Sequence, residues 1–314
     1  MHNPPPAIAV SGLTKRYGSP NGGLVAVNQI DFEVHSGEVF GFLGPNGAGK
    51  TTTIRMLTGL ARPTAGSAQV LGLDLLRDLP RIKKQIGVVP ESSNLYAELT
   101  ARDNLRFSMQ LYGVPRHERN ARAEDLLSRF RLSDKANTPF GRLSRGMKRA
   151  LTIAAALAHR PAVVFLDEPT TGLDVVSARS LRQMIAALGE EGVTVFLTTH
   201  YLEEAERLCD RIAVLVQGSI VALDTMEGLK ARVQNGPAVV VTLAGNDGQK
   251  APEVRRLYGE DVEAIITAAL KSARAEGLRV VGVNTVQPSL EDVFVQLTGL
   301  SVDMMQVDKN GKAT

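Results

Sequence analysis

Residues 44–51 read Gly44-Pro-Asn-Gly-Ala-Gly-Lys-Thr51, and they are the strongest indication of the fold class of the chain. It matches the phosphate-loop pattern G-x4-G-K-[ST] and lies between an expected strand at 38–43 and an expected helix from 50 to about 60. The glycines allow successive backbone N–H groups to face one centre at a helix N-terminus, which suits an anionic phosphate. The sequence therefore predicts a phosphate-binding loop in an α/β protein.

A second motif, Val163-Val-Phe-Leu-Asp-Glu168, is an apolar run that ends in two adjacent acids. The run predicts a strand buried on both faces. It would deliver its acids to the loop edge of the sheet, where open α/β sheets bind ligands. In a nucleotide hydrolase, Lys50 would reach the β- and γ-phosphates and Thr51 would ligate Mg²⁺. Asp167 would also hold Mg²⁺, and Glu168 would polarise the attacking water.

Strand-like and helix-like patterns alternate along the first 228 residues. They predict strands at 7–10, 24–27, 30–34, 162–166 and 193–197, helices at 177–188 and 201–208, and mainly helical structure at 99–158. Such alternation is typical of layered α/β folds. We expect an α/β phosphate-loop NTPase core with an N-terminal antiparallel β layer and a helical subdomain at about 95–158.

The chain has 314 residues, a length that suggests about two domains. Residues 1–228 form the expected domain of the phosphate loop. Strand patterns at 238–243 and 278–283 and helical patterns at 261–275 and 289–297 predict a small C-terminal α+β accessory domain at 229–300. Residues 301–314 are polar and are expected to form a flexible tail.

The composition excludes several classes of protein. One Cys argues against a disulfide-stapled secreted domain, and 44% apolar residues with a net charge of +3 argue against disorder. There is neither an apolar run of membrane-spanning length nor a readable secretory signal, so a soluble cytoplasmic protein is expected. The five His residues lack paired metal spacing, which argues against zinc. The small net charge argues against a nucleic-acid partner.

The near-neutral total hides one basic segment. Residues 101–150 hold 12 Lys and Arg against 5 Asp and Glu, a net charge of +7. Two interpretations stay open. The segment is a solvated helical face, as charge runs usually are, or it is a patch that attracts anionic headgroups or an acidic partner segment.

Four further features are similar to motifs of the ATP-binding-cassette (ABC) family. Leu143-Ser-Arg-Gly-Met147 resembles the family's LSGGQ signature, and Pro169-Thr-Thr-Gly-Leu-Asp174 resembles its D-loop. Val195-Phe-Leu-Thr-Thr-His200 resembles its switch-histidine segment, and Tyr17 occupies the position where the family stacks an aromatic ring on adenine. Motif order and spacing agree with the family over about residues 7–228, the expected ABC ATP-binding domain.

The resemblance implies a shared site between two chains packed head to tail. Each ATP would lie between the phosphate loop of one chain and residues 144–146 of the other, giving a homodimer with an ATP sandwich. His200 would sense the γ-phosphate and orient the water, whereas its alternative is a strand-end histidine without a ligand. Asp174 would connect the two sites across the dimer.

Three sets of candidate residues follow. The expected catalytic residues are Glu168, His200 and Lys50. The expected ATP-binding residues are Tyr17, Gly44, Pro45, Asn46, Gly47, Ala48, Gly49, Lys50, Thr51, Thr52, Ser144, Arg145, Gly146 and Asp174. The expected ligands of Mg²⁺ are Thr51, Asp167 and Glu91.

Three positions depart from the family pattern. Glu91 stands where the family usually has the glutamine of its Q-loop; its carboxylate accepts hydrogen bonds but donates none. Its alternative is an ordinary loop acid. Arg145 and Met147 replace a glycine and the glutamine of the signature. Arg145 would add a γ-phosphate contact or point to solvent.

The segment Pro288-Ser-Leu-Glu-Asp-Val-Phe-Val-Gln-Leu-Thr-Gly299 resembles the end of stand-alone ATPase subunits of ABC-2-type exporters of the daunorubicin-resistance kind. The resemblance implies an ATP-hydrolysing exporter subunit with a separate integral-membrane permease, bound through it to the inner face of the cell membrane. The alternatives are a soluble ABC ATPase without a transporter and a regulatory module without turnover. One phosphate loop, and 94 residues without heptads between Lys50 and Ser144, argue against translation and DNA-repair types. The presence of Glu168 and His200 argues against the regulatory module.

Overall fold

The computed structural model describes residues 5–19, 22–232, 238–245, 253–258, 261–286 and 289–300. These residues form two compact units, the first reaching Thr225 and the second beginning at Met226. Residues 301–314, which were expected to form a flexible tail, lie outside the described residues. Within the described ranges, no helix is both long and apolar enough to cross a membrane.

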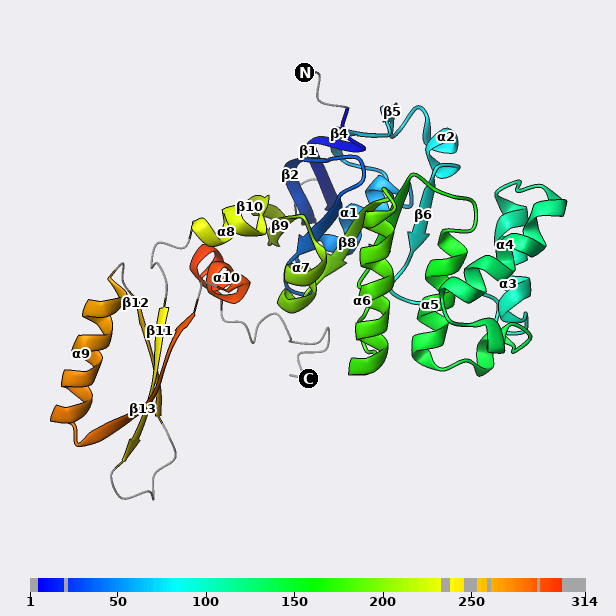
Figure 1. The fold of residues 1–314 in the computed structure, drawn as a ribbon. Helices are drawn as coiled ribbons and strands as arrows, with labels where there is room; N and C mark the ends of the chain where they lie inside the picture. The colour runs from blue at the N-terminus through cyan, green and yellow to red at the C-terminus, as the bar shows by residue number, and fades with distance from the viewer. Residues whose placement is uncertain are drawn as a thin grey trace. The chain divides into compact units, whose positions relative to one another are not determined.

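A six-stranded sheet forms the centre of the first unit, in the order β10-β9-β3-β8-β7-β6 (Figure 1). Its strands are β3 (Val39–Leu43), β6 (Ile86–Val89), β7 (Val163–Asp167), β8 (Thr194–Thr199), β9 (Arg211–Val216) and β10 (Ser219–Thr225). The pairings from β9 to β6 are parallel, and β10 is antiparallel to β9. Strands β3, β7 and β8 are buried along their whole length, and apolar residues occupy their centres, as in Val195–Leu197 of β8.

A second, antiparallel sheet has the order β2-β1-β4-β5 and confirms the expected N-terminal β layer. It consists of β1 (Ile8–Tyr17), β2 (Leu24–Val34), β4 (Ala65–Val70) and β5 (Leu73–Asp74). The separate strands expected at 24–27 and 30–34 are one strand, β2. Its interruption is a register shift against β1 with Gln29 in the left-handed region (φ 46°), so the polar residues there mark a β-bulge rather than a turn.

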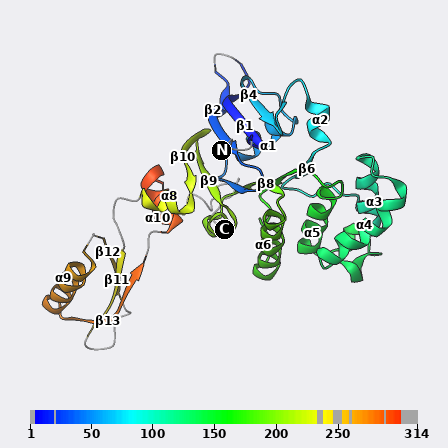
Figure 2. The same cartoon turned by 45° about the horizontal axis from the view of Figure 1, so that its top comes forward.

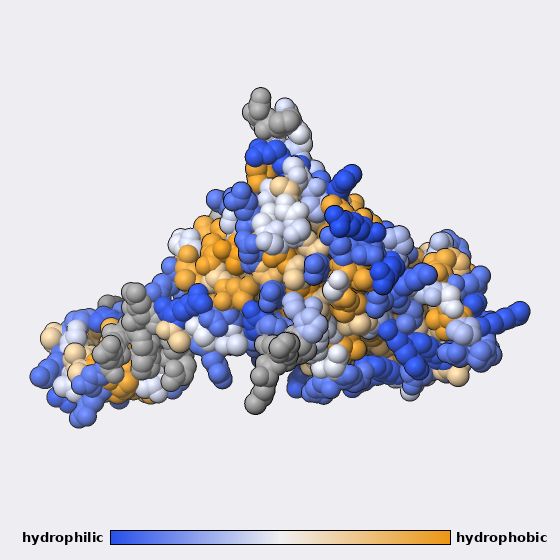
Figure 3. Space-filling model, turned by 90° about the horizontal axis from the view of Figure 1, so that it is seen from above, coloured by the Kyte–Doolittle hydropathy of each residue, from blue (hydrophilic) through white to orange (hydrophobic). Residues whose placement is uncertain are grey.

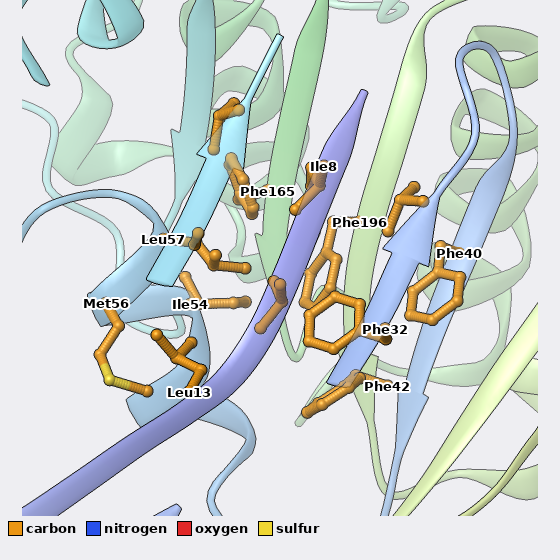
Figure 4. Close-up of a cluster of buried hydrophobic side chains, with 14 of the residues drawn as sticks. Ile8, Leu13, Phe32, Phe40, Phe42, Ile54, Met56, Leu57, Phe165 and Phe196 are labelled. Carbon is orange, nitrogen blue, oxygen red and sulfur yellow. The ribbon is translucent and has the colours of Figure 1, made fainter. Parts of the chain in front are cut away.

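The main core lies between these two sheets and helix α1 (Lys50–Leu57). Figure 4 shows Phe40 and Phe42 of β3 and Phe196 of β8 beside Phe32 of β2, with Ile8 and Leu57 nearby. The labelled phenylalanines are almost completely buried, and each contributes about 1.5–3 kcal/mol through burial. This packing holds β3 and α1, and therefore the loop between them, against a rigid support.

Three helices cover the opposite face of the central sheet: α5 (Arg145–Ala156), α6 (Val175–Glu190) and α7 (Leu202–Leu208) (Figures 1 and 2). Gly41 of β3 allows the end of α7 to approach closely. A Cβ atom at this position would lie 2.5 Å from Sγ of Cys209. The carboxyl ends of β3, β6, β7 and β8 share one edge of the sheet because these strands are parallel, and this edge carries the candidate site.

The helical subdomain contains α3 (Ala101–Leu111), α4 (Arg116–Arg129) and two short 3₁₀ turns before α5. The hydroxyl of Thr100 accepts a hydrogen bond from the backbone N–H of Asp103 at 3.1 Å and caps α3. The surface around α3 and α4, on the right in Figure 3, is mostly hydrophilic. The short helix α2 (Leu79–Lys83) precedes β6.

The second unit begins with α8 (Met226–Ala231) and contains an antiparallel sheet with the order β12-β11-β13. Its strands are β11 (Ala238–Gly245), β12 (Glu253–Tyr258) and β13 (Leu278–Val286). Helix α9 (Val262–Ala275) packs on one face of this sheet, where Val239, Val241 and Leu243 are buried. Helix α10 (Leu290–Thr298) begins with a complete capping box.

Candidate functional site

The loop between β3 and α1 is closely packed on both sides. Gly47 and Gly49 have positive φ angles of 80° and 107°. A Cβ atom at Gly49 would lie 2.4 Å from the carbonyl oxygen of Ala26, and one at Gly44 would lie 2.2 Å from that of Leu215. Glycine is therefore required for conformation at 47, for space at 44 and for both reasons at 49.

Lys50, the first residue of α1, folds back across this loop. Its side chain is only 5% exposed, and Nζ donates to the carbonyl oxygens of Gly44 at 2.6 Å and Pro45 at 3.1 Å. The same Nζ atom lies 3.1 Å from Oε1 of Glu168. A buried ion pair thus connects the phosphate loop with the acidic end of β7. No local sequence pattern predicts this contact.

Glu168 holds the central position of the site. Its Oε1 atom faces Lys50, and its Oε2 atom lies 2.7 Å from Nδ1 of His200 and accepts a hydrogen bond from Oγ1 of Thr171 at 3.0 Å. Burial raises the pKa of the Glu168 carboxyl, but the hydrogen bond from His200 and the charge of Lys50 outweigh burial and lower this pKa overall. An ionised carboxylate at neutral pH is the form that accepts a proton from water.

The backbone of Glu168 is held in the left-handed region, with φ of 50°. A residue with a side chain adopts this conformation at a cost of about 1–3 kcal/mol, and such residues cluster at functional sites. The surrounding contacts therefore have to stabilise the turn that aims this carboxylate at Lys50 and His200.

Thr51 and Asp167 meet from α1 and β7. Oγ1 of Thr51 donates to Oδ1 of Asp167 at 3.1 Å, and Oγ1 of Thr198 donates to the same oxygen at 2.7 Å. Burial raises the pKa of the Asp167 carboxyl, and this effect is larger than the lowering by the two hydrogen bonds. The neighbouring charges of Glu168 and Glu91 raise this pKa further.

A hydroxyl and a carboxylate in contact fit the oxygen ligands that Mg²⁺ takes beside substrate phosphates. Within the part of the chain that the structure describes, no three His, Cys, Asp or Glu side chains gather into a metal cage. The residues present therefore fit a magnesium ion that completes its coordination with phosphate oxygens and water, as this ion usually does in nucleotide sites.

A cleft of about 780 Å³ opens over these groups. It is lined by most of the predicted residues: Tyr17, Pro45, Asn46, Gly47, Ala48, Gly49, Lys50, Thr51, Thr52, Glu91, Arg145, Glu168 and His200. The sequence did not single out six other lining residues: Leu24, Ala26, Arg55, Thr171, Gly172 and Tyr201. Two of these, Thr171 and Gly172, belong to the D-loop-like segment, so that motif was the signal that could have found them.

Several candidates lie elsewhere. Ser144 caps α5 by accepting a hydrogen bond from the backbone N–H of Met147, and Ser144 and Gly146 line a different groove, beside α6. Asp174 caps α6 by accepting hydrogen bonds from the backbone and hydroxyl of Ser177 at 2.9 and 2.7 Å. These two hydrogen bonds lower the pKa of its carboxyl. The chain does not bring these residues to its own phosphate loop.

Arg145 does lie in the cleft of its own chain. A Cβ atom at Gly172 would approach its guanidinium to 2.4 Å, so the absence of a side chain in the D-loop-like segment provides its space. In the structure the Arg145 side chain is exposed and lies against that loop, and its contact with a γ-phosphate stays a prediction.

The basic segment 101–150 is partly internal. Arg149 is 6% exposed and donates to backbone carbonyl groups, and burial lowers the pKa of its guanidinium. Burial also lowers the pKa of Arg122, which donates to the carbonyl oxygen of Leu157. Arg102 pairs with Glu124. In the sequence these three residues are only positive charges. In the structure they have partners inside the unit, so the segment is neither a fully solvated face nor a fully available patch.

Comparisons with known proteins agree with this geometry. The profile of the ABC transporter family matches residues 27–171. The chain is 34% identical to the linearmycin resistance ATP-binding protein LnrL of Bacillus subtilis, covering 93% of this chain and 98% of the relative. It is 39% identical to the daunorubicin resistance ATP-binding protein DrrA2 of Streptomyces coeruleorubidus, covering 93% and 95%.

A third relative and a solved structure extend these similarities. The Nod factor export ATP-binding protein I of Mesorhizobium japonicum is 38% identical, with 95% of this chain and 88% of the relative covered. The dimeric post-hydrolysis state of the ATP-binding cassette MJ0796, bound to ADP and Pi, has a TM-score of 0.64 at 27% identity. It covers 69% of this chain and 98% of that chain.

Proposed function

The chain belongs to the ABC transporter family, and we propose that it is the ATP-hydrolysing subunit of an ABC-2-type exporter. The observation that carries the proposal is the contact of Lys50, Glu168 and His200 inside the cleft of the phosphate loop. Relatives that are similar along almost the whole chain include resistance and export ATP-binding proteins, which favours export as the work that hydrolysis drives.

In the proposed reaction the phosphate loop binds the phosphates of ATP, and Tyr17 stacks on the adenine. Lys50 exchanges its contacts with the carbonyl groups of Gly44 and Pro45 for the β- and γ-phosphates. Glu168 accepts the proton of the attacking water, and His200 holds the Glu168 carboxylate in place and contacts the γ-phosphate. This assignment rests on the contacts of Lys50 and His200 with the two oxygens of Glu168.

We assign Mg²⁺ to Thr51 and Asp167, with Glu91 beside them. The ion would neutralise charge on the phosphate oxygens when it is bound. The hydrogen bond between Thr51 and Asp167 supports this assignment, since it brings two oxygen ligands from different elements together. Glu91 lines the same cleft, and its charge acts on Asp167.

The proposed working form is a homodimer in which each ATP also contacts Ser144, Arg145 and Gly146 of the partner. In its own chain, Ser144 caps α5 but, unlike Arg145, it lines a groove other than the nucleotide cleft, which leaves Ser144 and Gly146 available to a second copy. Val175 and Val176, which follow Asp174, are 80% and 78% exposed. Adjacent exposed valines beside the D-loop-like segment favour burial against another chain.

Closure of such a dimer on ATP, and its reopening after hydrolysis, would pass motion to a separate integral-membrane permease. We therefore place the chain in the cytoplasm, held at the inner face of the membrane through that permease, without a nucleic-acid partner. The exported compound would be selected largely by the permease.

Co-purification of a trapped complex tests this function. The Glu168→Gln variant, incubated with Mg²⁺ and ATP, should hold a closed dimer and bring a polytopic membrane protein from solubilised membranes. The matched control is Glu263→Gln, which changes an exposed residue of α9 and should behave as the wild type. Sedimentation of the trapped chain with ribosomes or DNA, without a membrane partner, would contradict the export function.

A further inference from the structure

The side chain of Arg149 connects three parts of the first unit. Arg149 belongs to α5, the helix that the signature-like segment begins, and its side chain is 6% exposed. Its Nε atom donates to the carbonyl oxygen of Pro169 at 2.8 Å, and Nη2 donates to those of Asp167 at 2.7 Å and Glu168 at 3.1 Å. Its Nη1 atom donates to the carbonyl oxygens of Pro90 and Glu91.

These contacts use the whole guanidinium. An arginine side chain has five N–H donors in a rigid planar fork, and five backbone carbonyl oxygens receive them here. The acceptors are neutral, so the geometry of the fork, and not an ion pair with one carboxylate, explains why the side chain is buried here. The charges of Asp167, Glu204, Glu91 and Glu168 offset part of the cost of burying this cation.

The five acceptors belong to two loops at the same edge of the sheet. Pro90 and Glu91 follow β6, and the segment from Asp167 to Pro169 ends β7, which pairs with β6 in parallel. Strand pairing stops at Val89 and Leu166, so beyond these residues the ladder no longer holds the two loops together. The guanidinium takes over this connection where the ladder ends.

The carbonyl group of Glu168 is one of the acceptors, and this residue has the strained φ of 50°. The hydrogen bonds to the carbonyl groups on either side of it hold the same turn. The carboxylate of Glu168 meets Lys50 and His200 only because this turn has its present form.

We propose that Arg149 is a positioning residue for ATP hydrolysis, which fixes the turn of Glu168 against the loop of Glu91 and ties both to the signature helix α5. The proposal rests on the role given to Glu168 in the proposed function. Ser144 and Arg145 lie five and four residues before Arg149, at the start of the same helix. Through Arg149, a movement of these residues would also move the carboxylate of Glu168.

Lysine would not replace this arginine. An ammonium group keeps the charge but presents three donors from one atom, and it does not span five acceptors in two loops. In Arg149→Lys we expect the turn to relax while the phosphate loop, which makes no contact with this guanidinium among the hydrogen bonds that the structure describes, stays intact. Misplacement of a reacting group by about 1 Å is sufficient to lower a rate about 100-fold.

The test compares Arg149→Lys and Arg149→Gln with the wild type in steady-state ATP hydrolysis by the full chain. Turnover is expressed per ATP-binding site, so that partial unfolding does not imitate a lower kcat. We expect kcat to fall about 10- to 100-fold in both variants with ATP affinity unchanged. The matched control Arg142→Lys changes an exposed arginine near the start of α5 and should leave both quantities unchanged.

Backbone amide exchange supplies a readout that a general loss of stability would not produce. In Arg149→Lys, exchange should become faster at the amides of residues 91–92, 167–168 and 170–171 and stay unchanged in α1. Faster exchange throughout the first unit, or a folded Arg149→Lys protein with the kcat of the wild type, would overturn the proposal. Parallel loss of ATP affinity and kcat would also overturn it, because a positioning role for Glu168 does not affect binding.

The Glu168→Gln variant separates this proposal from the function on which it rests. If Glu168→Gln hydrolyses ATP at the rate of the wild type, the role of Glu168 is wrong. If Glu168→Gln is inactive while both Arg149 variants keep the kcat of the wild type, only the role of Arg149 is wrong.

Discussion

Nδ1 of His200 lies 2.7 Å from Oε2 of Glu168, although 32 residues separate them in the chain. The contact forms because β7 and β8 are neighbouring parallel strands, so that their carboxyl ends deliver both residues to one edge of the sheet. The other oxygen of Glu168 pairs with Lys50, which arrives from the phosphate loop. One carboxylate therefore connects three motifs that are separate in the sequence.

Replacement of Glu168 by glutamine should abolish the proton-accepting group and preserve the shape of the site. We expect turnover of ATP to fall about 10²- to 10⁴-fold, the usual contribution of a general base, while ATP still binds. Single-turnover hydrolysis and equilibrium binding of ATP measure the two effects. Wild-type turnover in the Glu168→Gln protein would show that another group accepts the proton.

Replacement of Thr51 by valine removes a hydroxyl and keeps a similar volume. Because this hydroxyl contacts Asp167 and is assigned to Mg²⁺, half-maximal turnover should require a higher magnesium concentration in Thr51→Val than in the wild type. Titration of the metal at saturating ATP measures the shift. Thr53→Val is the matched control, since the Thr53 hydroxyl bonds to the carbonyl oxygen of Gly49 on the buried side of α1. An equal metal requirement in all three proteins would refute the assignment of Thr51.

Replacement of Gly41 by alanine should destabilise the first unit through overpacking. Its new Cβ atom would lie 2.5 Å from Sγ of Cys209, and such strain costs about 1–3 kcal/mol of unfolding free energy. Chemical denaturation measures this loss, and Cys209→Ala in the same chain should recover part of it. At Gly282 an added Cβ atom would lie 3.7 Å from its nearest neighbour, so Gly282→Ala should change stability less.

The pair of Arg255 and Glu276 should make the stability of the second unit depend on pH. Two hydrogen bonds of 2.8 and 2.6 Å join their side chains. The bonds from Arg255, and then that from Ser272, lower the pKa of the Glu276 carboxyl to about 2. Because this pKa is lower in the folded state than its ordinary value of 4.5, the contribution is complete above about pH 4.5 and is lost as the pH falls toward 2.

Arg255→Gln should therefore lower the stability of the second unit at pH 7 and make little difference near pH 2. Unfolding monitored at several pH values measures this convergence. Arg274→Gln, at an exposed position of α9, is the control. A stability difference that stayed constant over the whole pH range would exclude the ion pair as its cause.

Residues that are close together in the chain specify the individual motifs of this protein. The glycines at 44, 47 and 49 and the lysine after them specify a loop, because only this residue pattern satisfies the required φ angles and close packing. The apolar run before Asp167 also predicts a buried strand, because strands that are buried on both faces consist of consecutive apolar residues. The cap of α3 and the capping box of α10 also follow from residues three positions apart.

Which of these motifs come into contact depends on the packing of the whole first unit. Strands β4, β5, β6, β9, β10 and β12 were not predicted, although Ile212–Val216 of β9 is a continuous apolar run. In the sequence, Arg149 is only one of the 12 Lys and Arg residues in segment 101–150. In the structure, its guanidinium bonds to five carbonyl oxygens at strand ends that are 18 to 59 residues away in the chain. Hydrogen bonds over such separations depend on strand order and helix packing, which a local period of two or 3.6 residues does not encode. The ion pair of Lys50 with Glu168 arises from the same long-range packing.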